Sequence, residues 1–579
     1  MQRPRLNKLI IKNFRCIVHT PVEIELDDIV VLVGPNNAGK SSILRAYEVV
    51  MSEGSQAGKL TRDDFPNGEI RPDALPEIEL HTIIYNDLPG QRWIHTDPST
   101  GEMLVREKWL WRDIGDPIRQ GYDVEKGAWD AQVPWGAANI ANSRRPQPHR
   151  VDAFTHPKEQ SDKILALLLS VLNERVQATD YGLVLDKLGE LQTLIVDQSR
   201  PRIAEVEAGV NQIISQVFPD YAIRFDARPE EELDKAIQFF KAPQLLMGPQ
   251  DGYQSTIDRQ GSGARRTLLW AALRYISEQG FDKPKSRSKK TPEKLAERPH
   301  VLLLDEPELC LHPGAVREAC RVLYDLPKTD NWQVMVTTHS PAFLDLSRDN
   351  TTIIRVERTT RGEIKGTTLF RPERVQLDED DKQKLKLLNI CDPHVAEFFF
   401  GGNVIIVEGD TEYTAFQHVI AAQPGRYKNV HIIRARGKAT IISLIKILNH
   451  FGTSYSVLHD SDLPTTVTKT GKEIANPAWA HNIKIYQEIQ QNPDPSHVRL
   501  LASVPNFEAS FFGEEVSGEK PYNALLEMQK SPASFQTIEH LLQVLLDHSR
   551  PDLPTGCVEW HSLEQLKEAA VNAKKTRSA

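Results

Sequence analysis

The chain has 579 residues, of which 40% are hydrophobic and 26% are charged. At about 150 residues per domain, this length predicts three or four structural units and excludes one small domain, and the composition excludes disorder throughout. The 70 Lys and Arg residues against 79 Asp and Glu residues leave a net charge of -9. Nucleic acid can therefore be bound only through local basic patches or through carboxylates that a metal ion neutralises.

We expect neither a membrane span nor a secretory signal. The longest apolar runs, such as 164–171 and 301–304, are shorter than the roughly 18 residues that cross a bilayer. The N-terminus alternates polar and apolar residues and lacks the apolar core of a signal peptide, so we expect a cytoplasmic protein. The five cysteines form no CxxC pair, which argues against structural zinc and a disulfide framework and predicts reduced, mostly buried thiols.

The first part of the chain is predicted to consist of strands around one glycine loop. Alternating or continuous apolar residues indicate each strand, and Gly, Pro, Asn and Trp crowd 114–150 and predict an irregular connection there. The predicted strands are 6–15, 22–26, 29–33, 76–85 and 103–111.

The apolar spacing changes to the period of a helix between 162 and 217. Plain core helices and an antiparallel hairpin that serves as a dimer contact both agree with this pattern. The basic run 281–299 is either a solvated loop or a loop that contacts phosphate. From about 396, strands and helices alternate again and predict a second α/β domain. The apolar series in the helical segment are Ile164, Leu167, Leu168, Val171 and Leu172, then Leu183, Leu185, Leu188, Leu191 and Leu194.

The segment 34–41, with the sequence GPNNAGKS, matches GxxxxGK[ST] between an apolar strand and a helix-compatible run. Its glycines permit a loop whose backbone N–H groups point at phosphate oxygens, Lys40 supplies a positive charge, and the Ser41 hydroxyl is a ligand for magnesium. The residues expected to bind ATP in this segment are Asn36, Asn37, Gly39, Lys40, Ser41 and Ser42.

A second apolar strand, 301–304, ends in a pair of carboxylates. Asp305 is expected to hold the magnesium ion through water, and Glu306 is expected to act as the general base on the attacking water. His339 follows a third apolar strand, where it can contact the γ-phosphate, although a lone histidine is usually structural.

Ser262 and Gly263 precede a helix whose first amides can bind phosphate. The order of Walker A, signature, Walker B and switch histidine resembles ATP-binding-cassette ATPases of the SMC and RecF kind. In that group the signature of one subunit completes the ATP site of another, so the resemblance implies a head-to-head dimer. It also implies that Arg15, near the first strand, lies close to the adenine. The signature here departs from the fuller Ser-Gly-Gly form of that group.

Acidic residues also follow strands in the last third of the chain. Glu408 comes after the apolar run 404–407, and Asp460 and Asp462 end a later strand, whose alternation would place both on one side. Their charges beside Glu408 would repel unless a cation lay between them, and Mg2+ or Mn2+ fits such hard oxygen ligands. Glu412, four residues after Glu408, can complete a second metal position.

This arrangement resembles a Toprim domain, which topoisomerases, primases and certain nucleases share. By that resemblance, Glu408 is the invariant-type glutamate, and Asp460 and Asp462 are the metal-binding pair. Glu508 is a further candidate carboxylate, and Lys520 is either a transition-state cation or a solvated lysine. Two metal ions can activate water and stabilise the leaving 3′ oxygen, and the absence of a zinc-module cysteine pattern favours a nuclease over a primase.

Both halves together resemble the OLD (overcoming lysogenisation defect) family of nucleases, and the Gabija nuclease subunit is a close analogue. The resemblance implies an α/β protein in which an ABC-type P-loop ATPase domain with a helical insertion precedes a C-terminal Toprim domain. It implies an ATP-regulated, Mg2+- or Mn2+-dependent endonuclease acting on double-stranded DNA in antiphage defence, as a dimer or tetramer and in some members with a helicase-like partner. The alternative is an ATP-dependent DNA sensor or repair clamp whose Toprim domain does not cut. The expected divisions are 1–150 and 246–395 for the ATPase, 151–245 for the insertion and its dimer contact, and 396–579 for the Toprim domain.

Overall fold

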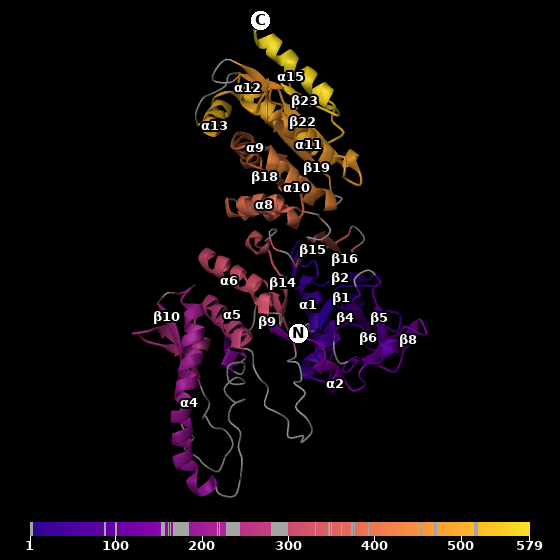
Figure 1. Cartoon of the computed structure of the whole chain (residues 1–579), viewed down its shortest axis with the longest axis vertical. Coiled ribbons are helices and arrows are strands. Elements are labelled where there is room, and N and C mark those ends of the chain that lie inside the picture. Colours follow the sequence, from indigo (N-terminus) through magenta and orange to yellow (C-terminus); the bar gives the residue numbers. More distant parts are fainter. Residues whose placement is uncertain are drawn as a thin grey trace. The chain divides into compact units, whose positions relative to one another are not determined.

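The computed structural model divides into two compact units, which are described separately. The first contains Met1–Leu32, Asn36–Phe343 and Val356–Gly366, and the second contains Val33–Pro35, Leu344–Arg355 and Thr367–Ala579 (Figure 1). The structure describes residues 4–578 except 86–87, 99–100, 152–156, 160, 163, 166–183, 217, 219, 227–243, 280–298, 330–331, 346–347, 349, 360–361, 372–374, 376, 392, 452–453, 468–471 and 514–518.

An antiparallel sheet accounts for much of the N-terminal sequence. Its strands follow the order β2-β1-β4-β6-β7-β8, and β5 pairs with β6. The prediction of an irregular connection over 114–150 was wrong, because this segment contains β7, β8, the helix α2 and the strand β9. The bounds are β1 Arg5–Lys12, β2 Val22–Glu25, β4 Glu77–Ile84, β5 Ile94–Thr96, β6 Met103–Leu110, β7 Ile118–Asp123, β8 Ala128–Asp130, α2 Ala138–Ser143 and β9 Gln147–Val151.

A parallel sheet of the same unit holds the nucleotide-site candidates. Its strands β3 (Ile29–Val33), β14 (Trp332–Thr337), β13 (His300–Asp305) and β9 lie in that order and run in one direction. β3 is buried along its whole length, as expected for a strand of a parallel sheet that helices cover on both faces. The helix α1 (Lys40–Met51) follows β3 after the glycine loop. Because parallel strands share one carboxyl edge, the loops after β3, β13 and β14 meet there.

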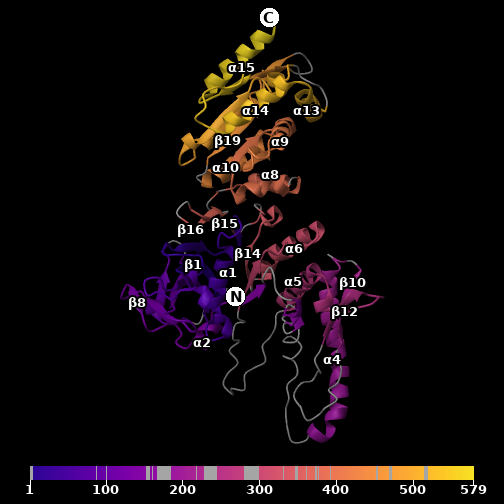
Figure 2. The ribbon, with the colours of Figure 1, turned by 180° about the vertical axis from the view of Figure 1, so that it is seen from behind.

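The segment with helical periodicity contains the long helix α4 (Val184–Ile214). In Figures 1 and 2, the helix α5 and the small sheet that includes β10 lie beside one end of α4, which agrees with the contacts among these elements. Ile164 is buried, whereas the other side chains of the two predicted apolar series, and the basic residues 281–298, lie outside the described residues. The bounds are β10 Tyr221–Asp226, β11 Gln244–Pro249, β12 Ser255–Thr256, α5 Ser262–Gln279 and α6 Pro313–Asp325, with β15 Thr351–Arg358 and β16 Ile364–Phe370 later in the chain.

The second unit is built on a sheet of order β18-β17-β19-β22-β23, in which only β23 runs antiparallel to its neighbour. The helices form two groups, because α9, α13 and α14 contact one another while α10 contacts α8 and α11. Apolar side chains of the strands, such as Ile405, Leu458 and Leu501, form one buried cluster with α9 and α14. The bounds are α8 Glu379–Cys391, β17 Asn403–Val407, α9 Asp410–Ala422, β18 Val430–Arg434, α10 Lys438–Phe451, β19 Tyr455–Asp460, β20 Thr465–Val467, β21 Glu473–Ala475, α11 Trp479–Ile489, β22 Val498–Ser503, α12 Phe507–Phe511, α13 Lys520–Lys530, α14 Pro532–Leu546, β23 Cys557–Glu559 and α15 Leu563–Ser578.

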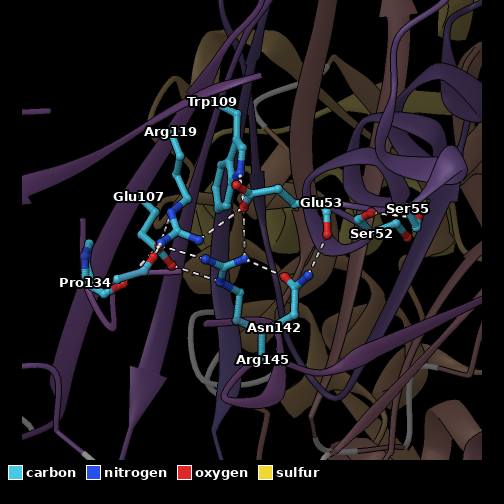
Figure 3. Close-up of polar contacts among 10 residues, drawn as sticks. Ser52, Glu53, Ser55, Glu107, Trp109, Arg119, Pro134, Asn142 and Arg145 are labelled. Carbon is cyan, nitrogen blue, oxygen red and sulfur yellow. Dashed lines mark hydrogen bonds and ion pairs between the residues drawn. The ribbon is translucent and has the colours of Figure 1, made fainter. Parts of the chain in front are cut away.

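A buried polar network ties the chain after α1 to the antiparallel sheet (Figure 3). Glu53 accepts hydrogen bonds from the Trp109 indole (2.9 Å) and from Arg119 (3.2 Å). Arg145 is fully buried and bonds Glu107 through two nitrogens, at 2.9 and 2.7 Å. Two guanidinium groups and two carboxylates thus balance one another, as buried charges require. This network fixes the far end of the helix that begins at the glycine loop.

The prediction of mostly buried thiols was wrong for the four cysteines whose side chains the structure describes. Cys310 is exposed, and Cys16, Cys320 and Cys557 are half-buried; three of the four lie in loops or a short edge strand, where burial is incomplete. Among the described residues, no helix is both long enough and apolar enough to span a membrane.

Candidate nucleotide and metal sites

Strand register brings the Walker B aspartate to the glycine loop. In the parallel sheet, Asp305 pairs with Thr337, and Thr337 pairs with Leu32 near the end of β3. The Thr337 hydroxyl donates to Asp305 Oδ1 at 2.6 Å, and the Ser41 hydroxyl donates to the same oxygen at 3.0 Å. The two side chains predicted to serve the magnesium ion, Ser41 and Asp305, are therefore in direct contact.

Lys40 and His339 also meet at this edge. Lys40 is buried, and its Nζ lies 2.9 Å from His339 Nε2. Burial lowers the pKa of Lys40, and burial together with the lysine charge lowers the pKa of His339. A neutral imidazole can accept from the ammonium group. Glu306 Oε1 lies 3.5 Å from the same imidazole nitrogen, so the predicted base, switch histidine and P-loop lysine form one cluster.

The glycine loop has the backbone that its sequence predicts. Gly39 has φ 101° and Asn37 has φ 60°, both in the left-handed region. A Cβ atom at Gly39 would lie 3.0 Å from Cys16 Sγ, so the position also lacks space for a side chain. Asn36 and Asn37 are exposed, whereas Ser42 is buried with its hydroxyl 3.4 Å from Cys16 Sγ.

Two further parts of the predicted ATP site, Arg15 and the signature residues Ser262 and Gly263, contact other parts of the protein. Arg15 Nε donates to Asp64 Oδ1 at 2.8 Å, so its side chain is anchored on a buried carboxylate. Ser262 and Gly263 begin α5, and a Cβ atom at Gly263 would lie 2.7 Å from the carbonyl oxygen of Cys310. The signature segment therefore packs closely on the turn after β13.

Three residues that contact these candidates, Thr337, Glu308 and Arg266, were not predicted from the sequence. Thr337 bonds Asp305, as described above. Glu308 accepts from the backbone N–H of His339 at 2.6 Å, and Arg266 donates to backbone carbonyls of the turn after β13. Glu308 lies two residues after Glu306 in the segment DEPE, so its position in the sequence could have identified it as a further candidate of the nucleotide site. Arg266 and Thr337 carry no local signal, because their partners lie at least 31 positions away.

The acidic candidates of the second unit meet where the sheet reverses its strand order. β17 lies between β18 and β19, and β19 lies between β17 and β22. The connections that follow β17 and β19 therefore run in opposite directions along the sheet, and ligands bind at such switch points. Glu408 follows β17 and accepts from the backbone N–H of Asp460 at 3.1 Å. Asp460 Oδ1 accepts from Phe507 N at 2.8 Å, and Glu508 accepts from the Thr411 hydroxyl at 2.8 Å.

Burial raises the pKa of three carboxyls in this cluster, Glu408, Glu412 and Asp460. The negative charges of neighbouring carboxylates, including Glu508, raise the pKa of Glu412 and Asp460 further. Buried carboxylates that repel one another are suitable oxygen donors for a divalent cation. Among the described residues, no group of three or more His, Cys, Asp or Glu side chains is already arranged to hold a metal ion.

Asp462 lies beyond the end of the strand whose alternation predicted that Asp460 and Asp462 project to the same side. β19 ends at Asp460, and Asp462 has φ 55°, so strand alternation does not determine its direction. Its carboxylate forms an ion pair with the buried Lys438 at the start of α10. Lys520 is exposed, with its Nζ 3.6 Å from Glu508 Oε1.

Comparison with protein families matches both parts of the chain. Residues 5–83 and 155–344 match the AAA ATPase domain, and residues 399–462 match the overcoming lysogenization defect protein-like TOPRIM domain. The OLD nuclease of Thermus scotoductus is 22% identical over 536 residues, which cover 89% of this chain and 93% of that protein.

Comparison with solved structures matches SMC head domains. A head bound to the C-winged helix domain of ScpA is 15% identical with a TM-score of 0.38, covering 63% of this chain and 97% of that one. The SMC head domain from Thermotoga maritima is 15% identical with a TM-score of 0.32, covering 63% and 98%.

The fold and the two family matches define a mixed α/β protein in which an ATPase domain precedes a C-terminal TOPRIM domain. More particularly, the chain is a homologue of the OLD nuclease. The family resemblance drawn from the motifs is thereby confirmed.

Proposed function

We propose that this chain is an ATP-regulated, divalent-metal-dependent DNA endonuclease. The observation that carries the proposal is the meeting of Glu408, Glu412, Asp460 and Glu508 at the switch point of the second sheet, where burial raises the pKa of the first three. The similarity to a protein named as a nuclease supports the same conclusion.

Glu408, Glu412, Asp460 and Asp462 are the side chains proposed to hold Mg2+ or Mn2+. Bound ions would lower the pKa of a coordinated water and stabilise charge on the scissile phosphate. Glu508 would orient Thr411 and the nearby Lys520, because both contact its Oε1 atom. Lys520 would place its positive charge near the phosphate, and the exposed position of this side chain leaves it accessible to DNA.

The first unit would bind ATP and regulate cleavage. Lys40 and Ser41 would contact phosphate and magnesium, Asp305 would hold the magnesium ion, and Glu306 would take a proton from the attacking water. Asn36, Asn37, Gly39 and Ser42 would form the remainder of the phosphate loop, Arg15 would lie near the adenine, and His339 would contact the γ-phosphate.

Assembly would complete the ATP site, because Ser262 and Gly263 of one copy would contact the nucleotide of another. We therefore propose a homodimer or tetramer. From the family resemblance, we also propose that it acts on double-stranded DNA in antiphage defence, together with a helicase-like subunit. We propose the segment 151–245 as an additional dimer contact. It is an insertion between the two parts of the ATPase domain, 1–150 and 246–395, and the TOPRIM domain 396–579 follows.

The test is cleavage of supercoiled plasmid by purified protein with Mg2+ or Mn2+, with and without ATP. Glu408→Gln and Asp460→Asn should abolish nicking while DNA binding is retained. Asp380→Asn is a matched control, since this carboxylate is exposed on α8 and pairs with Lys384. Normal nicking by Glu408→Gln would refute the proposal, and nucleotide-dependent DNA binding without cleavage in either metal would favour a DNA sensor.

A further inference from the structure

The backbone at Glu306, the proposed general base, has a conformation that glutamate rarely adopts. Its φ angle is 46°, in the left-handed region that favours glycine. A residue remains in this region only where surrounding contacts hold it there. Two backbone contacts do so, because Glu306 N donates to the Thr337 carbonyl at 3.0 Å and Leu309 N donates to the Glu306 carbonyl at 3.2 Å.

Arg266 adds a side-chain contact from a distant element. It lies on α5, 40 positions before Glu306, and its Nη1 atom donates to the carbonyl oxygens of Glu306 and Leu309, each at 2.9 Å. The arginine is only 3% exposed. Burying a guanidinium group is costly unless its N–H groups find acceptors, and here two acceptors belong to the turn that carries the base.

The signature segment contacts the same turn. Ser262 lies one helical turn before Arg266 on α5. The backbone at Gly263 approaches Cys310 so closely that a Cβ atom there would lie 2.7 Å from the Cys310 carbonyl oxygen. The start of α5 therefore touches the turn 306–310 at two points, one through backbone and one through the arginine.

We propose that Arg266 is a positioning residue for ATP hydrolysis, which links the signature helix to the backbone of Glu306 within one chain. A displacement of α5 would move the Glu306 carbonyl through Arg266 and so misalign the carboxylate with the attacking water. Engagement of the signature segment would thereby regulate hydrolysis in its own subunit. The inference rests on the proposed role of Glu306 and adds the element that controls its alignment.

The test compares ATP hydrolysis and ATP binding by the full chain. Arg266→Lys keeps the charge but loses the planar group that reaches two acceptors, and Arg266→Gln removes the charge as well. Both should lower kcat by about ten- to a hundredfold, as expected for a misplaced catalytic group, while the Kd of a fluorescent ATP analogue stays within about threefold. Arg321→Lys is the control, because that guanidinium is half-exposed on α6 and pairs with Glu318, and its kcat should be unchanged.

A double-mutant cycle separates positioning from general damage. In a Glu306→Gln background, Arg266→Lys should cause no further loss of kcat, because the group that it positions is already absent. An equal additional loss, an unchanged kcat in the single variants, or loss of ATP binding in both Arg266 variants would overturn the proposal. Retained hydrolysis by Glu306→Gln alone would instead refute the proposed role of Glu306, so the two failures are distinguishable.

Discussion

The Nζ atom of Lys40 lies 2.9 Å from Nε2 of His339, although the two residues are 299 positions apart in the chain. The contact exists because β3 and β14 are neighbours in the parallel sheet. The glycine loop follows one strand, and His339 follows the other. Nucleotide binding should therefore depend on groups from both loops.

Replacing Lys40 with alanine should weaken ATP binding. The ammonium group is the buried cation of the cluster, and a hydrogen bond to a charged group contributes about 1.5–3 kcal/mol, which corresponds to roughly a ten- to a hundredfold increase in Kd. Titration with a fluorescent ATP analogue measures the change. Lys59→Ala, at a partly exposed ion pair with Asp116, serves as control, and an unaltered Kd for Lys40→Ala would contradict the assignment.

Replacing Lys438 with methionine should tighten divalent-metal binding at the TOPRIM site. The buried ammonium pairs with Asp462, and its charge also acts on Glu408, so it competes electrostatically with a metal ion. Removing a positive charge that contacts a proposed metal ligand directly is expected to strengthen metal binding by about tenfold or more. A calorimetric titration with Mn2+ measures the affinity independently of cleavage. Lys428→Met, at an exposed position, should leave it unchanged, and weaker binding by Lys438→Met would exclude the competition.

Replacing Arg145 with methionine should destabilise the first unit. The variant leaves Glu107 buried without its bidentate partner, and breaking a buried ion pair from one side costs about 3–5 kcal/mol. Melting temperature and urea midpoint measure the loss. Arg426→Ala breaks an ion pair whose arginine is 55% exposed and should cost about 1 kcal/mol or less. Equal effects of the two variants would show that the network in Figure 3 contributes no more than a surface pair.

Acidification should destabilise the second unit through His548. Burial, assisted by the charge of Arg499, lowers the pKa of this imidazole below 6.5 in the folded chain. Below that pH the unfolded chain takes up a proton that folded His548 does not, so the free energy of unfolding falls as the pH decreases from 6.5 toward the lowered value. Melting temperatures on either side of pH 6.5 measure the slope.

His548→Gln should reduce this dependence on pH, since glutamine keeps a polar contact for the Ser456 hydroxyl, 2.9 Å from His548 Nε2, and cannot be protonated in this range. His540→Gln, at a partly exposed histidine on α14, is the matched control. If both variants keep the slope of the unmodified chain, His548 is not its source.

Local sequence was sufficient to predict the central strands of the two sheets but not the strands that pair beside them. The runs at 29–33 and 404–407 are continuously apolar, which is the pattern of strands buried on both faces, and they form β3 and β17. The segment 114–150 has no such pattern. β9 exists because it pairs with β13, whose residues lie about 150 positions later, and a pairing over that separation leaves no trace in local composition.

Local sequence also identified some residues of the candidate sites but not the direction of others. Gly39, Lys40, Asp305 and Glu408 are recognisable because phosphate loops and strand-end carboxylates require those residue types at fixed local spacing. Strand alternation does not apply to Asp462, because the strand ends two residues earlier.

The amino-acid sequence was enough to identify the chemical groups that are present: a phosphate loop, a Walker B pair and a series of acidic residues after apolar strands. Their local spacing reflects constraints between near neighbours along the chain. Which of these groups meet is visible only in the folded chain, where Glu408 contacts the backbone of Asp460, Lys438 contacts Asp462, and Arg266 contacts the carbonyl of Glu306. These contacts depend on the order of non-consecutive strands and on how helices pack against them, and that order is set by the burial of whole faces rather than by any short segment.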